Sequence, residues 1–124
     1  MKPMIVMQDD FSLSWSAVAS MKGVIKTIDR TIDIEDGTHE IEPFNIWMGA
    51  QELQTVESCF PHGTIFVSVV DPGVGTNRRA CVALLNDGSY VVTPDNGTLT
   101  LVHATIGVKE VREIDETKNR LTTH

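Results

Sequence analysis

The chain has 124 residues, and we expect residues 1–124 to form a single domain. A hydrophobic content of 41% is typical of a globular protein with a packed core and excludes a disordered chain. Ten basic residues against 17 acidic ones give a net charge of −7, which leaves no basic surface to follow a nucleic-acid backbone. We therefore expect no nucleic-acid partner.

The sequence carries no signal for export or membrane insertion. The N-terminal apolar run reaches Asp9 and Asp10 too soon to span a bilayer or to act as a secretory signal. We therefore expect a cytoplasmic protein with no membrane partner. In that reducing compartment Cys59 and Cys81 are expected to be two small core residues. The four histidines show no ligand spacing, so no metal site is expected.

The apolar positions predict two strand–helix units in the first half of the chain. Residues 4–8 form a short apolar run typical of a buried strand, and Ser14 is a candidate cap for the helix that follows. The apolar residues of that helix fall on one face: Ala17, Val18, Met21, Val24, Ile25 and Ile28. Alternation over 31–35 predicts a second strand. Pro43 is suited to the first turn of another helix, which should end before residues 60–63.

The second half predicts a central strand followed by a hairpin. Residues 64–70 are almost continuously apolar, as expected for a strand covered on both faces. Residues 81–85 and 90–93 flank an Asp87-Gly88 pair, which favours a tight hairpin. A short helix over 99–104 and a strand over 110–114 complete the prediction. These elements predict an α/β domain with a mostly parallel central sheet sandwiched by helices and an antiparallel hairpin.

Two strand ends carry the candidate site residues, because ligands bind at the carboxyl ends of strands in such sheets. Asp9 and Asp10 follow the first strand. They are either turn and helix-start residues, or one of them accepts both hydroxyls of a ribose. Asp71 ends the apolar strand, and Arg78 lies seven residues further on. Arg78 either folds back to orient the Asp71 carboxylate, which would then hold a water molecule, or makes a surface ion pair.

Other residues near these strand ends are less informative. The Gly-Val-Gly segment at 73–75 is a weak phosphate-loop signal, and no Gly-Lys-Ser/Thr follows it. Phe44, Trp47 and Trp15 are either packing aromatics or platforms for a ligand.

Residues 66–79 (FVSVVDPGVGTNRR) closely resemble a motif of the S-adenosylmethionine (SAM) hydroxide adenosyltransferase family. Its members are relatives of the fluorinating and chlorinating enzymes that act on SAM. Three further segments agree with the family in order and spacing: Asp10-Phe11, residues 38–44 (THEIEPF) and residues 93–97 (TPDNG). The similarity covers essentially the whole chain.

The resemblance implies roles for individual residues. Asp71 and Arg78 match two members of the family's Asp-Arg-His set that activates water. Asp10 matches the aspartate that binds the ribose hydroxyls, and Phe44 matches an aromatic residue beside the nucleoside. The implied reaction is hydrolysis of SAM: water or hydroxide attacks the ribose 5′ carbon, methionine leaves and adenosine forms. The halogenating relatives lack an aspartate at the position of Asp71, which favours water as nucleophile. No metal or redox cofactor is implied.

Several departures from the family pattern accompany this resemblance. The family's catalytic histidine is expected beyond His124, and the C-terminal β-barrel domain that holds the adenine is absent. Family members are homotrimers with the site between neighbouring subunits, so we expect little or no activity from these 124 residues alone. The alternative is a non-catalytic remnant that acts as a binding or assembly module; the coding sequence past His124 would separate the two. The family's usual Thr-Asp-Phe-Gly reads Asp9-Asp10-Phe11-Ser12 here, and Trp15 stands where an acidic residue is common.

Overall fold

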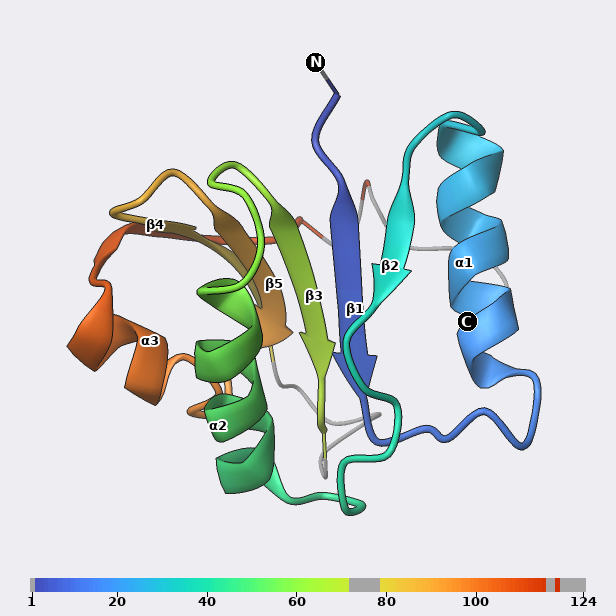
Figure 1. Ribbon diagram of the computed structural model, residues 1–124, viewed down its shortest axis with the longest axis horizontal. Helices are drawn as coiled ribbons and strands as arrows, with labels where there is room; N and C mark the ends of the chain where they lie inside the picture. Colours follow the sequence, from blue (N-terminus) through green and yellow to red (C-terminus); the bar gives the residue numbers. More distant parts are fainter. Residues whose placement is uncertain (1, 72–78, 116–117, 119–124) are drawn as a thin grey trace.

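A computed structural model describes residues 2–71, 79–115 and 118. Within this part of the chain the sheet has six strands (Figure 1). In their order across the sheet they are β2 (Ile34–Asp36), β1 (Ile5–Asp9), β3 (Ile65–Val69), β5 (Tyr90–Pro94), β4 (Ala80–Leu85) and β6 (Val108–Glu113). β1 pairs in parallel with β2 and β3, and β3 pairs in parallel with β5, whereas β4 runs antiparallel to β5 and β6. The predicted α/β class, with a mostly parallel sheet and a β4–β5 hairpin, is confirmed.

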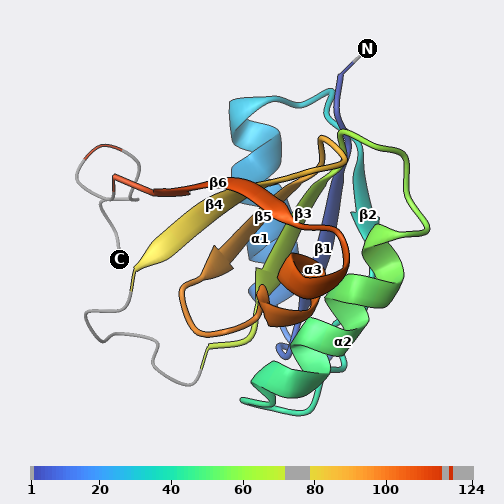
Figure 2. The same cartoon turned by 90° about the vertical axis from the view of Figure 1, so that its left-hand side faces the viewer.

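Helices lie on both faces of the sheet. They are α1 (Ala17–Ile28), α2 (Ile46–Glu57) and the short α3 (Thr100–Thr105). Figure 2 shows α1 on one face and α2 with α3 on the other. The main apolar core joins Leu53 of α2 and Val102 of α3 to strand residues such as Val6, Phe66 and Val91. The sandwich predicted from the alternation of strands and helices is therefore observed.

The two central parallel strands differ in how completely they are covered. All five residues of β1 are buried, as predicted for the first strand. In β3 buried residues alternate with partly buried ones, so the predicted covering of both faces is complete on one face and partial on the other. The physical reason is the position of α1, which lies toward the β2 side of the sheet and leaves one face of β3 only partly covered (Figure 1).

The beginnings of the helices correct two predictions. Ser14 does not cap α1, which begins at Ala17; the Ser14 hydroxyl lies 3.0 Å from that of Ser12 instead. Pro43 lies outside α2, because Phe44 adopts a φ of +65° that no helix continues through. Asn45 is the cap, and its side-chain oxygen accepts a hydrogen bond from the Met48 amide at 3.0 Å.

Other local expectations differ by small amounts. β2 begins at Ile34 rather than at residue 31, because the Asp29 carboxylate holds the Thr31 amide in a turn at 2.9 Å. Cys81 is buried as expected, but Cys59 is exposed at the end of α2, so the prediction of two core cysteines is wrong for Cys59. No helix in the described part of the chain is long and apolar enough to cross a membrane.

The last residue of α2 is a buried acid. Glu57 is 3% exposed and lies beside Asp87 in the β4–β5 turn. Burial, reinforced by the neighbouring Asp87 charge, raises the pKa of Glu57 to about 7. Folding therefore favours the protonated form of Glu57. The stability that this protonation contributes is fully present below the unfolded pKa near 4.5 and is lost as the pH rises toward about 7.

We expect Glu57→Gln to remove most of this pH dependence, because the amide has the shape of the protonated acid and cannot ionise. Above pH 7 the variant should be about 1–3 kcal/mol more stable than the wild type, and near pH 4.5 the two should be similar. Urea unfolding at several pH values measures this difference. Glu52→Gln on the same helix is the control; an equal gain there, or no gain at Glu57, contradicts the account.

Candidate active site

The strand ends that carry the candidate acids lie at the same edge of the sheet. β1 and β3 are parallel neighbours, and their register pairs Asp9 with Val69. Asp10 and Asp71 therefore follow neighbouring strands at the same edge (Figure 1). Asp10 is half-buried, and so is Asp71, which lies beyond Val70. The topology thus brings the two candidate carboxylates to one end of the molecule, where α/β sheets bind ligands.

Asp10 is already joined to the segment that precedes α2. Its Oδ2 accepts a hydrogen bond from the Phe44 backbone amide at 2.8 Å. Among the described residues its Oδ1 has no hydrogen-bond partner, so an acceptor remains for a ligand hydroxyl. The Phe44 side chain is 64% exposed, and the neighbouring Trp47 is exposed as well. These two aromatic residues therefore do not pack in the core, and the backbone of Phe44 lies beside the Asp10 carboxylate.

The adjacent Asp9 has a different environment. It is completely buried, and its Oδ2 lies 2.8 Å from Nδ1 of His39 while its Oδ1 accepts the Phe11 amide at 3.0 Å. The other ring nitrogen of His39 lies 2.6 Å from Asp36, which also pairs with Lys22. Of the pair Asp9-Asp10, both carboxylate oxygens of Asp9 are thus engaged inside the fold, whereas only Oδ2 of Asp10 is bonded to a described residue.

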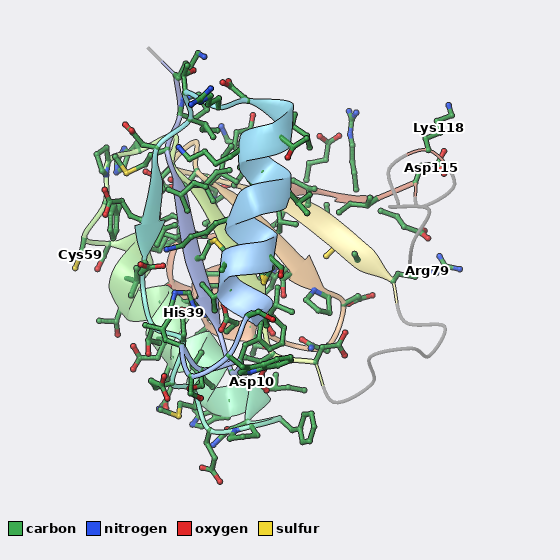
Figure 3. The ribbon with its side chains drawn as sticks, turned by 90° about the vertical axis from the view of Figure 1, so that its right-hand side faces the viewer. Asp10, His39, Cys59, Arg79, Asp115 and Lys118 are labelled. Carbon is green, nitrogen blue, oxygen red and sulfur yellow. The ribbon has the colours of Figure 1, made fainter. Side chains whose placement is uncertain are left out.

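Electrostatics favour a charged His39. Burial by itself lowers the pKa of the imidazole, but hydrogen bonds and charges from Asp36 and Asp9 outweigh it and raise the pKa of His39 above its ordinary value. Sequence reasoning did not assign this residue. The available signal in the sequence was His39, five residues before Phe44, together with the extra acid Asp9. Figure 3 shows His39 near Asp10 on this side of the molecule.

Ser12 has a backbone conformation that suits glycine. Its φ is +63°, a region that costs a non-glycine residue about 1–3 kcal/mol. The Ser12 hydroxyl accepts the Ser14 amide at 3.2 Å, which offsets part of this cost. The glycine that the family commonly has at this position therefore has a conformational explanation.

We expect Ser12→Gly to raise the free energy of unfolding by about 0.5–1 kcal/mol. The relief of backbone strain at residue 12 should exceed the free-energy cost of the greater conformational entropy that glycine gives the unfolded chain. The same change at Ser20, which is exposed within α1, should lower it by a similar amount because glycine disfavours helix. Chemical denaturation of both variants measures the signs. A destabilised Ser12→Gly variant would contradict backbone strain at Ser12.

The second half of the predicted pair falls outside the described residues. Arg78 is not among them, so its pairing with Asp71 stays a prediction. The next residue, Arg79, is described: its guanidinium binds Glu113 at 2.9 Å, and both side chains are largely exposed. Figure 3 places Arg79 well away from Asp10. Arg79 is therefore an anchor for β6 and does not substitute for Arg78.

A hollow lies at the carboxyl end of β5. It has a volume of about 310 Å³ and is lined by Pro94, Asp95, Asn96, Gly97, Leu99, Thr100 and His103. The turn 94–97 therefore borders open space together with Leu99, Thr100 and His103 at the start of α3. No group of three or more histidine, cysteine or acidic residues within the described ranges is arranged to hold a metal ion.

The family model for the SAM hydroxide adenosyltransferase N-terminal domain matches residues 5–124 of the chain. The chain belongs to this family. A (R)-S-adenosyl-L-methionine hydrolase of Methanocaldococcus jannaschii is 39% identical over 116 residues, which are 90% of this chain and 44% of that protein. A fluorinase of Actinopolyspora mzabensis is 27% identical over 138 residues, covering 94% of this chain and 46% of that protein.

Solved structures agree with this adenosyltransferase fold. A conserved protein from Thermotoga maritima has a TM-score of 0.90 and 43% sequence identity, covering 93% of this chain and 44% of that chain. A protein from Thermus thermophilus has a TM-score of 0.84 and 29% identity, covering 94% and 49% of the two chains. The chain thus spans a little under half the length of the relatives it matches.

Proposed function

We propose that this adenosyltransferase chain supplies the ribose-holding and water-holding part of an enzyme that hydrolyses SAM to adenosine and methionine. Asp10 would accept the ribose hydroxyls, with Phe44 against the nucleoside. Asp71 and Arg78 would hold the attacking water. The observation that carries the proposal is the β1–β3 register, because it brings Asp10 and Asp71 to one edge of the sheet. A ribose held at one strand end then has its 5′ carbon beside the other.

The reaction requires the protein mainly to position the reacting atoms. The water oxygen forms a bond to the 5′ carbon while the bond from that carbon to sulfur breaks. The electron pair of the broken bond neutralises the sulfonium, so methionine leaves without an acid. The water proton passes to Asp71 and then to solvent. Holding water, 5′ carbon and sulfur in line is catalysis by proximity, and the Asp71 carboxylate adds general-base assistance.

Two arguments favour hydrolysis over halogenation. The motif resemblance implies that the halogenating relatives lack an aspartate at the position of Asp71. The hydrolase relative is also the more similar, at 39% identity against 27% for the fluorinase. An anionic carboxylate beside the 5′ carbon would repel a halide and orient a water. Water is therefore the proposed nucleophile.

The proposal extends to the assembly and its compartment. We place the complete protein in the cytoplasm as a homotrimer in which a neighbouring subunit completes the site. Both cysteines in the described part of the chain are free thiols, and Cys59 is exposed, which suits a reducing compartment. The exposed aromatic residues Phe44 and Trp47 leave apolar surface for a nucleoside or a second subunit to cover.

Incubation with SAM followed by chromatography of the products tests the function. The complete gene product, with any residues that the gene encodes after His124, should release adenosine and methionine in equal amounts. The 124 residues alone should release little or none. If the complete product leaves SAM unchanged, hydrolysis is ruled out and the binding or assembly alternative takes its place. Robust turnover by the 124 residues alone would contradict the need for further parts.

A further inference from the structure

The turn after β5 is tied to the end of β3 by one side chain. Nδ2 of Asn96 donates a hydrogen bond to the Val70 carbonyl oxygen at 2.6 Å. Val70 is completely buried and directly precedes Asp71. The paired residues of the two strands run from Ile65 with Tyr90 to Val67 with Val92. The Asn96 side chain therefore extends the connection between β3 and β5 beyond the ladder, to the residue before the candidate catalytic acid.

The orientation of the Asn96 amide is fixed by a second set of contacts. Its Oδ1 accepts the Thr98 hydroxyl at 2.6 Å and the Thr98 backbone amide at 3.2 Å. A backbone N–H can only donate, so the oxygen of Asn96 must face Thr98 and its NH₂ must face the Val70 carbonyl. Thr98 is itself buried. The donor that holds Val70 is thus locked in place by groups on its own turn.

The same turn also holds the other described end of the segment that follows Asp71. The Asp95 amide donates to the Arg79 carbonyl at 2.8 Å, and Pro94 pairs with Ala80. Two consecutive residues, Asp95 and Asn96, therefore donate hydrogen bonds to the carbonyl oxygens of Arg79 and Val70, the two described residues that flank this span. Asp71 directly follows the bonded carbonyl of Val70.

We propose that Asn96 is a positioning residue for Asp71: its amide fixes the Val70 carbonyl and thereby the direction in which the Asp71 carboxylate faces the bound substrate. This inference rests on the proposed function, and it gives the Pro94-Asp95-Asn96-Gly97 turn a task in catalysis without contact to substrate. A misplacement of about 1 Å at a reacting group can cost about a hundredfold in rate. The Asn96 contact therefore acts on turnover more than on binding.

Asn96→Asp is the sharpest test, because it keeps the shape and the acceptor for Thr98 but replaces the donor to Val70 by a carboxylate oxygen. In the complete gene product we expect kcat for adenosine formation to fall about 10- to 100-fold, with KM for SAM within about threefold. Hydrogen exchange of the amides at residues 70, 71 and 79, followed by NMR, should be at least about tenfold faster.

The matched control is Asp87→Asn. Asp87 makes the same local turn contact, accepting the Ser89 amide at 3.0 Å, but it lies in the β4–β5 turn, away from the carboxyl ends of β1 and β3. It should leave kcat and the exchange at residues 70, 71 and 79 unchanged. Thr98→Val, which removes one of the two donors that orient Asn96, should give a smaller loss of kcat in the same direction.

The outcomes separate this inference from the function on which it rests. Unchanged kcat and exchange in Asn96→Asp, or equal losses in Asp87→Asn, would overturn the positioning role. If the wild type does not hydrolyse SAM, the proposed function fails on its own. Faster exchange at residues 70 and 71 in Asn96→Asp alone would then still support the tie between Asn96 and the end of β3.

Discussion

Asp71→Asn should lower kcat for SAM hydrolysis in the complete gene product by about 10²–10⁴-fold, the usual contribution of a general base. KM should change by less than about threefold, because the amide keeps the shape of the carboxylate and Asp71 does not hold the ribose in this account. Asparagine can contact water, but it has no charge to orient the water or to take its proton. Chromatography of adenosine over a range of SAM concentrations separates kcat from KM.

The control for Asp71→Asn is the same exchange at Asp33, an exposed residue just before β2. Asp33→Asn should keep wild-type kcat. Asp10→Asn is the complementary variant and should raise KM, because it weakens an acceptor for the ribose hydroxyls. Wild-type turnover in Asp71→Asn would remove this residue from the mechanism, and a loss confined to KM would reassign it to binding.

His39→Ala is expected to destabilise the domain by about 3–5 kcal/mol, the usual effect of removing one partner of a buried ion pair. Asp9 is completely buried, and its carboxylate lies 2.8 Å from the His39 imidazole, whose raised pKa favours the protonated form. Without the imidazolium, the Asp9 charge would stay buried without compensation. Urea unfolding followed by circular dichroism measures the loss.

A double variant keeps this prediction testable even if His39→Ala fails to fold. Asp9→Thr introduces the residue that the family commonly has at this position and removes the buried charge. Asp9→Thr/His39→Ala should therefore be more stable than His39→Ala alone. If the double variant is no more stable, the cost of removing His39 comes from lost packing and not from the unpaired Asp9 charge.

The ion pair also gives stability a pH dependence of known sign. The pKa of His39 in the folded state is raised, so the stability that its charge contributes is complete below the unfolded pKa near 6.5 and is lost as the pH rises through the folded pKa. Asp36 and Asp9 contact the ring, and Lys22 faces Asp36. Asp9→Thr should reduce the slope of stability above about pH 6.5. An unchanged slope contradicts a charged His39.

Much of the fold follows from periodicity in the sequence. The apolar runs at 4–8 and 64–70 predicted the two central strands, and the Asp87-Gly88 pair predicted the β4–β5 hairpin, where Gly88 has a φ of +89°. Parallel neighbours then place Asp10 and Asp71 at one edge. The alternation of strands and helices was sufficient for this result, because a parallel sheet leaves few ways to order such units.

The unpredicted features depend on contacts between residues distant in sequence. Asp9 and His39 are 30 residues apart, and no local pattern indicates that a buried acid meets a buried imidazole. Pro43 was misassigned because the positive φ of Phe44 is stabilised by Asp10, 34 residues earlier. The exposed Cys59 follows from the place where α2 ends, which composition does not determine.

The origin of the oxygen in the product tests the central claim most directly. The complete gene product is incubated with SAM in water enriched in oxygen-18, and the products are analysed by mass spectrometry. Attack of water at the 5′ carbon predicts one labelled oxygen in adenosine and none in methionine. Unlabelled adenosine would contradict attack at the 5′ carbon. Release of an adenosine thioether together with an oxygen-18-labelled fragment of the amino acid would contradict it as well.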